Sequence, residues 1–542
     1  MKLDQKILLG NEAIVQGALE AGVNFVSTYP GTPSSEIGNV FSRLAKKNNV
    51  YFEFSTNEKV ALEASIGASF SGLKTLVAMK NFGVNVCSDS LIPLMYTGTV
   101  GPMVIIVGDD PSCWSSAQSE ENSRGFAYLG HIPILEPSDP QECKDFTKLA
   151  YEISERFKLP VILRTTTRVA HQRMPVAIEP LNPRPLLKGR FVKNSHQFIT
   201  MPPRVLEMKK ELLEKIEKIR QFSDKPSINK IYGSVKSAKL GIITSGISYL
   251  HAKEALTELG LELPILKLDF FYPLSEKKIN GFIRNLKKVL VVEELEGFLE
   301  KEIAGLAKNN NPKLEIFGKN VLSEIGELGP QKIATALAKI LGKKIKVQNI
   351  KPDIPKRFPK PCLGCPHIFT FSILKKMSSE NIVFGGDIGC YMLAGVPPFE
   401  VQDYLFSMGS STGVAHGIGK STNQKVITLM GDSTFFHSGI PALINTVFNK
   451  SAVLMIVLDN RTTAMTGHQT NPGIGKTGMD EATTELKPED IARACGVKNI
   501  KVIDPVNIQE YEAVIKEFLA KDEPSLIVAR RICVLLAQRQ VK

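Results

Sequence analysis

The stretch from residue 425 to residue 460 constrains the fold of this chain most. An apolar run at 425–430 leads into Gly431-Asp432, a helix-like segment follows, and a second apolar run ends at Asn460. Two apolar runs joined by a helix predict a parallel βαβ unit, and the carboxyl ends of parallel strands lie at one edge of the sheet. We therefore expect Asp432 and Asn460 to converge, although they lie 28 positions apart.

The two side chains at this edge offer hard oxygen ligands. Mg²⁺ prefers octahedral oxygen coordination, shared between one or two carboxylates, waters and the phosphates of a ligand. The pattern resembles the thiamine diphosphate signature, Gly-Asp-Gly followed by Asn at the end of the next strand, with Ser433 in place of the second glycine. The alternative is an ordinary strand-turn-helix unit in which Asp432 caps the helix.

Length and composition indicate a large globular enzyme. The 542 residues are too many for one core, and the 43% hydrophobic and 23% charged content is ordinary. Neither a membrane-spanning apolar run nor a signal peptide is present, so we expect a cytoplasmic protein with no membrane contact. The net charge is +12, but lysines alternate with glutamates, as at 207–218, which favours solvated helices over a nucleic-acid surface.

The order of strand-like and helix-like segments predicts an α/β fold with parallel sheets. Strands are expected at 25–27, 75–79, 104–107, 240–246, 288–294 and 525–529, and helices at 13–21, 59–71 and 251–258. The expected domains are an α/β domain at 1–180, a linker with an exposed charged helix at 181–235, a second α/β domain at 236–345, a Pro/Lys-rich linker at 346–361, and a third α/β domain at 362–542.

Two N-terminal segments carry candidate functional residues. Residues 27–35 predict a strand end, a turn and a helix opened by Pro33. The free amides at such a helix start suit an anionic or carbonyl ligand. Glu58 opens the next helix, where a glutamate is by itself a favourable partner for the helix dipole.

Eight cysteines in a chain expected in the cytoplasm indicate buried thiols or metal ligands rather than disulfides. Cys362 and Cys365 form a Cys-x-x-Cys pair, which fits half of a zinc ribbon or a redox pair. The thiols that we interpret as small buried hydrophobic groups are Cys87, Cys113, Cys143 and Cys495.

Six motifs occur in the order seen in the 2-oxoacid:ferredoxin oxidoreductases. They are Tyr29-Pro-Gly-Thr-Pro-Ser-Ser35, Glu58 with Gly67-Ala-Ser69, Cys362-Leu-Gly-Cys-Pro-His367, Gly386-Asp-Ile-Gly-Cys-Tyr391, Gly431-Asp-Ser433 and Leu458-Asp-Asn-Arg-Thr-Thr-Ala-Met-Thr-Gly467. The chain resembles this family over nearly its whole length, and most closely the α subunits of its indolepyruvate (arylpyruvate) branch. The resemblance implies a multidomain thiamine diphosphate-binding fold. Along the chain, a doubly wound parallel-sheet domain that binds the pyrimidine would come first, and one that binds the diphosphate would come last. A transketolase C-terminal-like α/β domain would lie between them.

The resemblance also implies roles for individual residues. Glu58 matches the glutamate that hydrogen-bonds the aminopyrimidine ring, and Thr32 matches the threonine near the thiazolium and the substrate. Asp432 and Asn460 match the side-chain Mg²⁺ ligands, and Thr462 matches a backbone-carbonyl ligand. The residues in segments expected to line the cofactor are Gly386, Asp387, Gly389, Gly409, Ser410, Gly431 and Ser433.

Two further cysteines gain a role from the resemblance. Cys390 and Cys533 match the positions at which the family completes a 4Fe-4S site with Cys362 and Cys365. Four thiolates in a reducing compartment suit iron-sulfur chemistry, although a four-cysteine zinc site is geometrically equivalent. Cys495 is an available substitute for Cys533 as the fourth ligand.

Substrate recognition has one candidate residue. A 2-oxoacid needs a cation or amides for its carboxylate, and Arg124 is our candidate. The alternative is a surface arginine paired with Glu120 or Glu121 at helical spacing. Two histidines that flank the metal-binding turns, His437 and His468, could move protons near neutral pH, but we favour supporting roles for both.

These features favour thiamine diphosphate-dependent oxidative decarboxylation of an aryl 2-oxoacid with coenzyme A, with electrons passing through the cluster to ferredoxin. The aryl preference comes from the resemblance alone. Family members carry a ferredoxin-like domain with two Cys-x-x-Cys-x-x-Cys-x-x-x-Cys-Pro runs, and the 542 residues hold no such run. We expect a smaller β subunit as partner, together with ferredoxin or a separate ferredoxin-like subunit. The alternatives are a non-redox thiamine diphosphate-dependent 2-oxoacid decarboxylase or carboligase, and an inactive, zinc-stabilised scaffold subunit.

Overall fold

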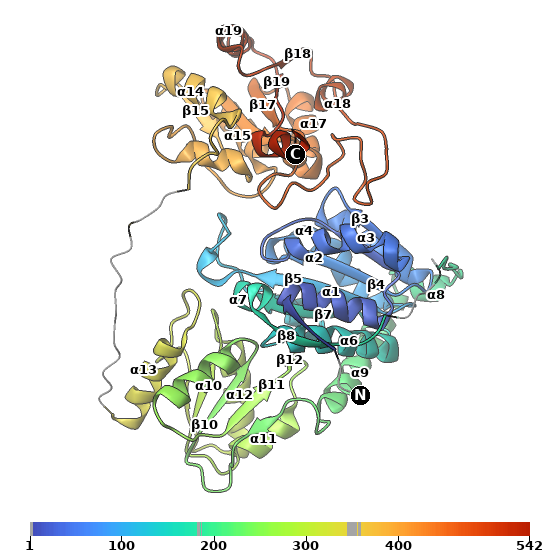
Figure 1. Ribbon diagram of the computed structural model, residues 1–542, viewed down its shortest axis with the longest axis vertical. Helices are drawn as coiled ribbons and strands as arrows, with labels where there is room; N and C mark the ends of the chain where they lie inside the picture. The colour runs from blue at the N-terminus through green and yellow to red at the C-terminus, as the bar shows by residue number, and fades with distance from the viewer. Residues whose placement is uncertain (1–3, 182–184, 186, 344–354, 356–358, 542) are drawn as a thin grey trace. The chain divides into compact units, whose positions relative to one another are not determined.

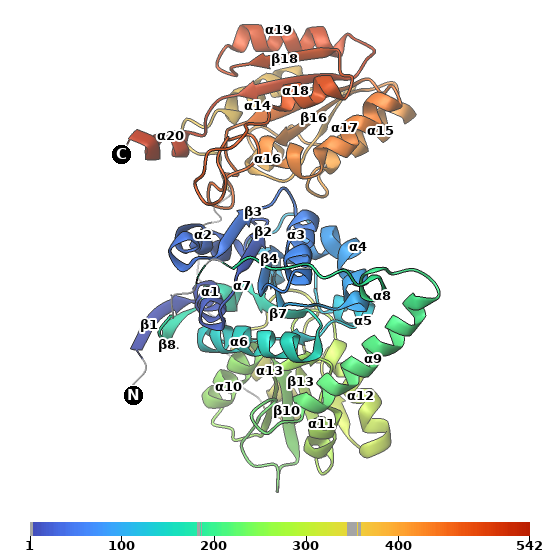
Figure 2. The ribbon, with the colours of Figure 1, turned by 90° about the vertical axis from the view of Figure 1, so that its right-hand side faces the viewer.

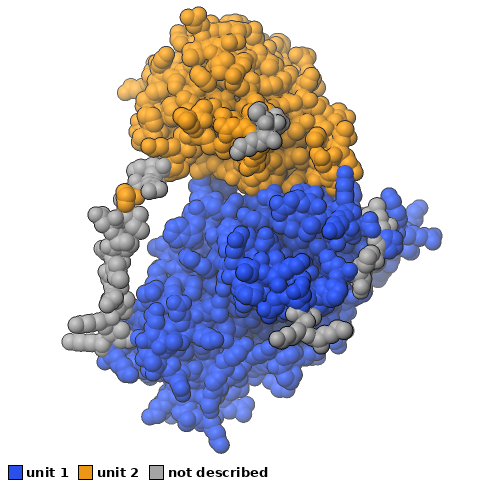
Figure 3. Space-filling model, in the orientation of Figure 1, with its two compact units in different colours: residues 1–53, 58–352 blue, residues 54–57, 353–542 orange. Residues whose placement is uncertain are grey.

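The computed structural model describes residues 4–181, 185, 187–343, 355 and 359–541. The chain forms two compact units, which Figure 3 shows in different colours. The first unit comprises residues 1–53 and 58–352, and the second comprises residues 54–57 and 353–542. The linker predicted at 346–361 lies largely outside the described residues, and the other predicted domain boundaries stay predictions.

A seven-stranded sheet forms the first part of the first unit (Figure 1). Its strands, in spatial order, are β12 (Phe270–Tyr272), β6 (Ile134–Leu135), β7 (Val161–Thr166), β5 (Met103–Asp109), β4 (Thr75–Lys80), β2 (Phe25–Thr28) and β3 (Tyr51–Phe54). The strands from β6 to β2 run parallel, whereas β12 pairs antiparallel with β6. Since β5 and β7 are buried along their whole lengths, they have the character of parallel strands that are covered on both faces.

The helices of the first unit follow the predicted order. They are α1 (Gly10–Ala21), α2 (Ser35–Leu44), α3 (Glu58–Phe70), α4 (Asn81–Thr97), α5 (Gly125–Gly130), α6 (Pro140–Phe157), α7 (Thr167–His171), α8 (Ser195–Phe198), α9 (Arg204–Ser223), α10 (Ser248–Glu258), α11 (Glu276–Ile283), α12 (Phe298–Asn310) and α13 (Pro330–Leu341). The sequence predicts that the charged helix α9 is exposed, and this prediction is wrong for one of its faces. Met208, Leu212 and Ile219 on that face are buried, because apolar residues recur at helical spacing among the charges.

A second, five-stranded sheet completes the first unit. Its strands, in spatial order, are β14 (Glu315–Phe317), β13 (Lys288–Val292), β10 (Leu240–Ser245), β11 (Ile265–Leu268) and β9 (Ile231–Tyr232), and only β9 is antiparallel to its neighbour. Side chains of α10 and α13, among them Leu256 and Leu337, form one core with this sheet. After β11 the chain continues into β12, which pairs with β6 of the first sheet. Two consecutive strands thus belong to different sheets. A separate two-stranded antiparallel sheet pairs β1 (Asp4–Leu9) with β8 (Arg173–Ile178).

The second unit is built on an all-parallel sheet. Its order is β15 (Ile382–Gly385), β16 (Lys425–Gly431), β17 (Val453–Asp459), β19 (Ser525–Arg530) and β18 (Asn499–Ile503). Ile427 and Ile456 share a core with α14 (His367–Met377) and α19 (Ile508–Leu519). Val426 and Val457 share another with α15 (Ser410–Ser421), α17 (Ile440–Phe448) and α18 (Pro488–Ala494). Alternate residues of one strand therefore face opposite helical layers, and the predicted doubly wound sheet is confirmed (Figure 2).

Two short helices complete the second unit, α16 (Asp432–Thr434) and α20 (Val534–Val541). α16 begins directly after β16, so the turn after this strand is helical from its first residue. Among the helices that the structure describes, none combines the length and the apolar character needed to cross a membrane.

Candidate active site

The carboxyl edge of the second unit's sheet carries the predicted metal-binding residues. β16 and β17 are parallel neighbours, with Gly431 opposite Leu458. Asp432 follows one strand and Asn460 follows the other, so both side chains start from the same edge, as the sequence predicts. Both residues are buried, with 3% and 8% of their surfaces exposed. A carboxylate and an amide oxygen are thus available at a place that water reaches poorly.

Asp432 lies in surroundings that disfavour a negative charge. Burial and the neighbouring carboxylate of Asp459 raise the pKa of Asp432 to about 7. Its Oδ2 accepts a hydrogen bond of 3.0 Å from Nδ2 of Asn471. A bound divalent cation would stabilise the ionised carboxylate and so offset the free-energy cost of its burial beside Asp459. This donor set fits Mg²⁺ carrying a diphosphate.

The loop after β17 holds Asn460 and Thr462 together. The backbone N–H of Thr462 donates to Asn460 Oδ1 over 3.2 Å, and Asn460 Nδ2 lies 3.5 Å from His367 Nε2. Burial lowers the pKa of His367 to about 4, so its ring is neutral at neutral pH and can accept from the amide. His367 ends the Cys-x-x-Cys-Pro-His motif, which therefore reaches the predicted magnesium ligand.

Asp387, which is predicted to line the cofactor, is held by backbone groups near the start of α15. It is fully buried, and its carboxylate accepts hydrogen bonds from the backbone N–H groups of Ile388, Gly409 and Ser411 at 2.8, 2.7 and 3.0 Å. Burial raises the pKa of Asp387 to about 6. Its contacts fix the first turn of α15, so we expect Asp387 to act on a ligand through this turn.

The glycines of this edge allow close approach of other groups. A Cβ would lie 2.5 Å from Gln402 if built on Gly386, 2.4 Å from Ser438 on Gly409, and 2.4 and 2.8 Å from Tyr391 on Gly389 and Gly431. Gly409 also has a φ of +83°, which glycine adopts readily. Ser410 Oγ donates to the carbonyl of Ser407, and Ser433 is buried in α16. The predicted segments thus form a tightly packed backbone around the edge.

Glu58 lies in the first unit, at the first residue of α3. It is 8% exposed, and its side chain lies directly against Gly83 of α4. A Cβ built on Gly83 would lie 2.5 Å from Glu58 Cγ and 3.0 Å from Oε1. Nearby Cys87 has its pKa raised to about 12 by burial and by the charge of Glu58. The carboxyl group is therefore confined by a neighbouring helix, as a positioned acid requires.

Thr32 lies in the loop between β2 and α2. Its carbonyl accepts a long hydrogen bond of 3.4 Å from Ser115 Oγ. The loop follows the carboxyl end of a parallel strand, which is the usual place for ligands in open α/β sheets. Thr32 and Glu58 both belong to the first unit, and the predicted metal ligands belong to the second.

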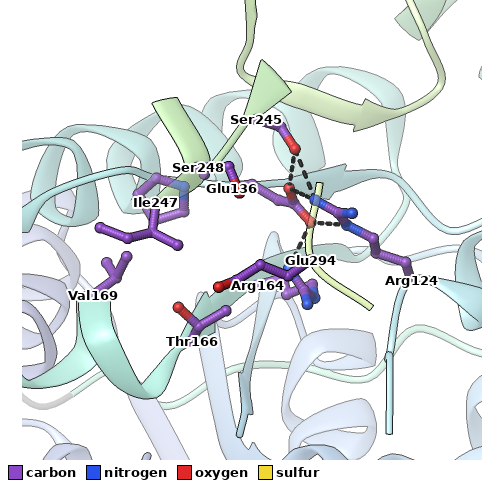
Figure 4. Close-up of a pocket in the computed structure, with 11 residues that line it drawn as sticks. Arg124, Glu136, Arg164, Thr166, Val169, Ser245, Ile247, Ser248 and Glu294 are labelled. Carbon is purple, nitrogen blue, oxygen red and sulfur yellow. Dashed lines mark hydrogen bonds and ion pairs between the residues drawn. The ribbon is translucent and has the colours of Figure 1, made fainter. Parts of the chain in front are cut away.

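The guanidinium group of Arg124 donates hydrogen bonds to acceptors inside the first unit. Its Nε and Nη2 donate to the two carboxylate oxygens of Glu136 over 2.7 and 2.6 Å, and Nη1 donates to Glu293 over 3.1 Å. Nη2 also donates to Ser245 Oγ over 2.8 Å. Figure 4 draws Arg124 beside Glu136 and Ser245. Arg124 is 2% exposed, so the alternative of a surface arginine paired with Glu120 or Glu121 is wrong. The contacts favour a structural role and weigh against substrate binding.

The predicted cluster cysteines all belong to the second unit, where the charges of three of them act on the fourth. Burial and the charges of Cys365, Cys533 and Cys362 raise the pKa of Cys390 to about 12. Cys495 behaves differently, because burial alone raises its pKa and it packs against the core of α15 and α17. Among the described residues, no three His, Cys, Asp or Glu side chains are close enough to hold a metal ion. The four thiols have the donor chemistry of an iron-sulfur or zinc site, and their assembly into one stays a prediction.

The two histidines near the metal-binding turns differ in their contacts. His437 is 5% exposed, and its Nδ1 lies 2.5 Å from Ser438 Oγ. Burial lowers the pKa of His468, and its backbone N–H donates to the carbonyl of Thr463 over 3.0 Å. Both histidines are thus held by local contacts, in keeping with supporting roles.

Comparison with known proteins identifies the family. The chain is 42% identical to "Indolepyruvate oxidoreductase subunit IorA" of Methanothermobacter marburgensis, over 98% of this chain and 87% of that protein. This chain belongs to the IorA family. Its similarity to the IorA subunit of Pyrococcus horikoshii is 40% identity over 99% of this chain and 87% of that protein. "2-oxoglutarate synthase subunit KorA" of Archaeoglobus fulgidus is a more distant relative, 28% identical over 59% of this chain and 97% of that protein.

Family models match the three α/β regions of this IorA family member. "Pyruvate flavodoxin/ferredoxin oxidoreductase, thiamine diP-bdg" matches residues 16–216, and "Indolepyruvate oxidoreductase domain" matches residues 229–354. "Thiamine pyrophosphate enzyme, C-terminal TPP binding domain" matches residues 384–529. The solved 2-oxoglutarate:ferredoxin oxidoreductase from Magnetococcus marinus shares the fold, with a TM-score of 0.51 at 19% identity over 62% of this chain and 65% of that chain. The predicted thiamine diphosphate-binding fold is confirmed.

Some residues of the site could not be found by motif. Gly83 lies against Glu58, and Asn471 holds Asp432, yet neither belongs to a motif with a recognised role. For Gly83 the only signal is its position inside a helix, where glycine is unfavourable. Asn471 lies 39 positions after Asp432 in an irregular loop, so no periodic pattern connects the two.

Proposed function

We propose that this chain is the thiamine diphosphate-binding α subunit of an indolepyruvate ferredoxin oxidoreductase. The reaction is the oxidative decarboxylation of an aryl 2-oxoacid with coenzyme A, which yields an acyl-CoA, CO₂ and two reduced ferredoxins. The family supports the thiamine-dependent oxidation of a 2-oxoacid. The aryl side chain, coenzyme A and ferredoxin follow from the relatives' names and from the motifs, and so belong to the proposal.

One contact supports the redox reaction over simple decarboxylation. The backbone N–H of Cys533 donates to the carbonyl of Asn460 over 3.0 Å. A proposed cluster ligand is therefore next to a proposed magnesium ligand, and electrons would have only a short path from the reacting carbon to the cluster. A non-redox decarboxylase has no need of four thiols at this place.

The proposed roles of the chain's residues follow from their positions. Asp432, Asn460 and the carbonyl of Thr462 would bind Mg²⁺ and through it the diphosphate. Thiamine diphosphate, when bound, supplies the electron sink for loss of CO₂. Glu58 would hold a proton at a carboxyl oxygen that Gly83 keeps in place, and the buried edge excludes water. Cys362, Cys365, Cys390 and Cys533 would hold the 4Fe-4S cluster.

Partners and location complete the proposal. A smaller β subunit would form a heterodimer with this chain, and the complex would deliver electrons to ferredoxin or to a ferredoxin-like subunit. We place the complex in the cytoplasm, without nucleic-acid or membrane partners.

The test is anaerobic purification of the chain with its partner subunit. We expect a coloured protein with iron, acid-labile sulfide and thiamine, and turnover on indolepyruvate and phenylpyruvate above that on pyruvate and 2-oxoglutarate. In Asp432→Ala, added Mg²⁺ and thiamine diphosphate should no longer raise the melting temperature. A colourless, iron-free protein that still decarboxylates would favour the non-redox alternative, and zinc without turnover would favour the scaffold.

A further inference from the structure

Lys80 is the last residue of β4, at the carboxyl edge of the seven-stranded sheet. The neighbouring strand β2 is parallel to β4, and its following loop contains Gly31 and Thr32. Gly31 lies so close to the lysine that a Cβ built on it would be 2.8 Å from Lys80 Cβ. Lys80 therefore borders the same loop as Thr32, at the edge where open α/β sheets bind ligands.

The ammonium group of Lys80 has few partners. It donates to the carbonyl of Ser115 over 3.1 Å and lies 5.3 Å from the centre of the Phe82 ring. Among the described residues, no carboxylate forms an ion pair with it. An ammonium has three N–H donors, so donors remain for a ligand.

The acidic groups near Lys80 are engaged elsewhere. Asp110 accepts hydrogen bonds from the hydroxyls of Ser116 and Thr167, at 2.6 Å each. Glu121 accepts a hydrogen bond of 2.8 Å from Asn85. These acids attract the ammonium from a distance without neutralising it at contact.

Two lysines of the same unit that are more deeply buried than Lys80 both form ion pairs. Lys144 pairs with Glu20 at 3.3 Å, and Lys267 pairs with Glu142 and Asp269 at 2.7 and 2.6 Å. Burial lowers the pKa of Lys80, whereas the paired Lys267 has its pKa raised. Lys80 is less buried than these two lysines, so its ammonium group keeps its charge without an ion pair to any described carboxylate and can be reached by an anionic ligand.

We propose that Lys80 binds the carboxylate of the 2-oxoacid substrate. The inference rests on the proposed function and deepens it, because it gives the substrate a cation that Arg124 does not offer. With the carboxylate on Lys80, the keto carbon would lie toward the loop of Thr32. Lys80 is then a substrate-binding residue, and its effect falls on the binding of the 2-oxoacid.

The experiment compares three variants of the complete complex, Lys80→Met, Lys80→Arg and the control Lys74→Met. Lys74 lies immediately before the other end of β4, donates to the carbonyl of Ala21 over 2.8 Å, and lies 5.4 Å from the Tyr151 ring. Like Lys80, Lys74 is a lysine whose ammonium group donates to a backbone carbonyl and lies near an aromatic ring. Since a hydrogen bond to a charged group contributes roughly 1.5–3 kcal/mol, Lys80→Met should raise KM for indolepyruvate by about 10- to 100-fold.

The expected pattern has three parts. Lys80→Arg keeps KM closer to wild type, Lys74→Met leaves KM unchanged, and all variants keep the rise in melting temperature caused by Mg²⁺ and thiamine diphosphate. If Lys80→Met kept wild-type turnover and an unchanged KM, the role of Lys80 would be overturned and the proposed function would stand. Loss of the rise in melting temperature with Mg²⁺ and thiamine diphosphate in Lys80→Met would also overturn the role of Lys80. A wild-type complex that turns over no 2-oxoacid would instead overturn the proposed function, and the role of Lys80 with it.

Discussion

Replacement of Gly83 by alanine tests whether Glu58 is a positioned acid. The new Cβ would lie 2.5 Å from Glu58 Cγ and 3.0 Å from Cδ and Oε1. Ordinary contacts between carbon atoms begin at about 3.5 Å, so the carboxyl group must move by about 1 Å or rotate away. The backbone of α4 can stay in place, because the atoms in the way belong to a flexible side chain.

The effects on stability and on activity should separate. Alanine is better than glycine inside a helix by about 0.5–1 kcal/mol, and an off-rotamer Glu58 side chain costs about as much. The net change in the free energy of unfolding should therefore stay within about 1 kcal/mol. Displacement of a catalytic group by about 1 Å can reduce turnover by about 100-fold, so we expect a fall of that order in kcat.

The assay measures kcat with indolepyruvate and the melting temperature of the complete complex. Gly67→Ala is the matched control, because Gly67 lies in α3 and a Cβ there meets nothing within 4 Å. The control should melt at the same or a slightly higher temperature with unchanged kcat. Full turnover in Gly83→Ala would refute the reasoning, since Glu58 would then work from a displaced position or not at all.

Three further perturbations address stability and the cluster. Burial raises the pKa of Glu294 to about 7, so the folded state holds this proton more tightly than the unfolded state. The free energy of unfolding should therefore fall as pH rises from about 5 to 8. Urea unfolding of Glu294→Gln should show a smaller fall with pH, and a fall equal to that of the wild type would contradict this reasoning. Arg124→Met should lose about 3–5 kcal/mol, because buried Glu293 loses its ion-pair partner and Glu136 keeps only Arg164, whereas the exposed Arg168→Met should lose less than about 1 kcal/mol. An unchanged melting temperature with a raised KM in Arg124→Met would instead support substrate binding. Cys533→Ser should reduce iron and sulfide content after anaerobic purification while Cys495→Ser should not, and the reverse result would transfer the fourth ligand to Cys495.

Local patterns in the sequence predict the sheets well. β4, β5, β16 and β17 are runs of buried apolar residues bounded by polar turns, and such runs have few other stable places than the middle of a parallel sheet. The sequence of the charged helix α9 does not show which of its faces is covered, because its apolar face only becomes buried when other elements pack against it.

Arg124 shows where sequence reasoning fails. Its partners Glu136 and Glu293 lie 12 and 169 positions away, so no local spacing could reveal the ion pairs. Lys80 is the opposite case, because it ends an ordinary apolar strand and no motif singles it out. Only the structure shows that none of the described carboxylates forms an ion pair with it.

The sequence by itself determined the family, the order of the α/β regions and the two polar residues, Asp432 and Asn460, that follow neighbouring strands. These properties depend on residue type and spacing along the chain, which motifs and hydrophobic periodicity record directly. Only the tertiary structure decided which charged groups have partners and which backbone positions lie in contact. Gly83 lies against Glu58, Cys533 lies beside Asn460, and Arg124 is neutralised by distant carboxylates. Such contacts join residues that are far apart in sequence. The packing of helices and strands decides which of them meet, and spacing along the chain does not record it.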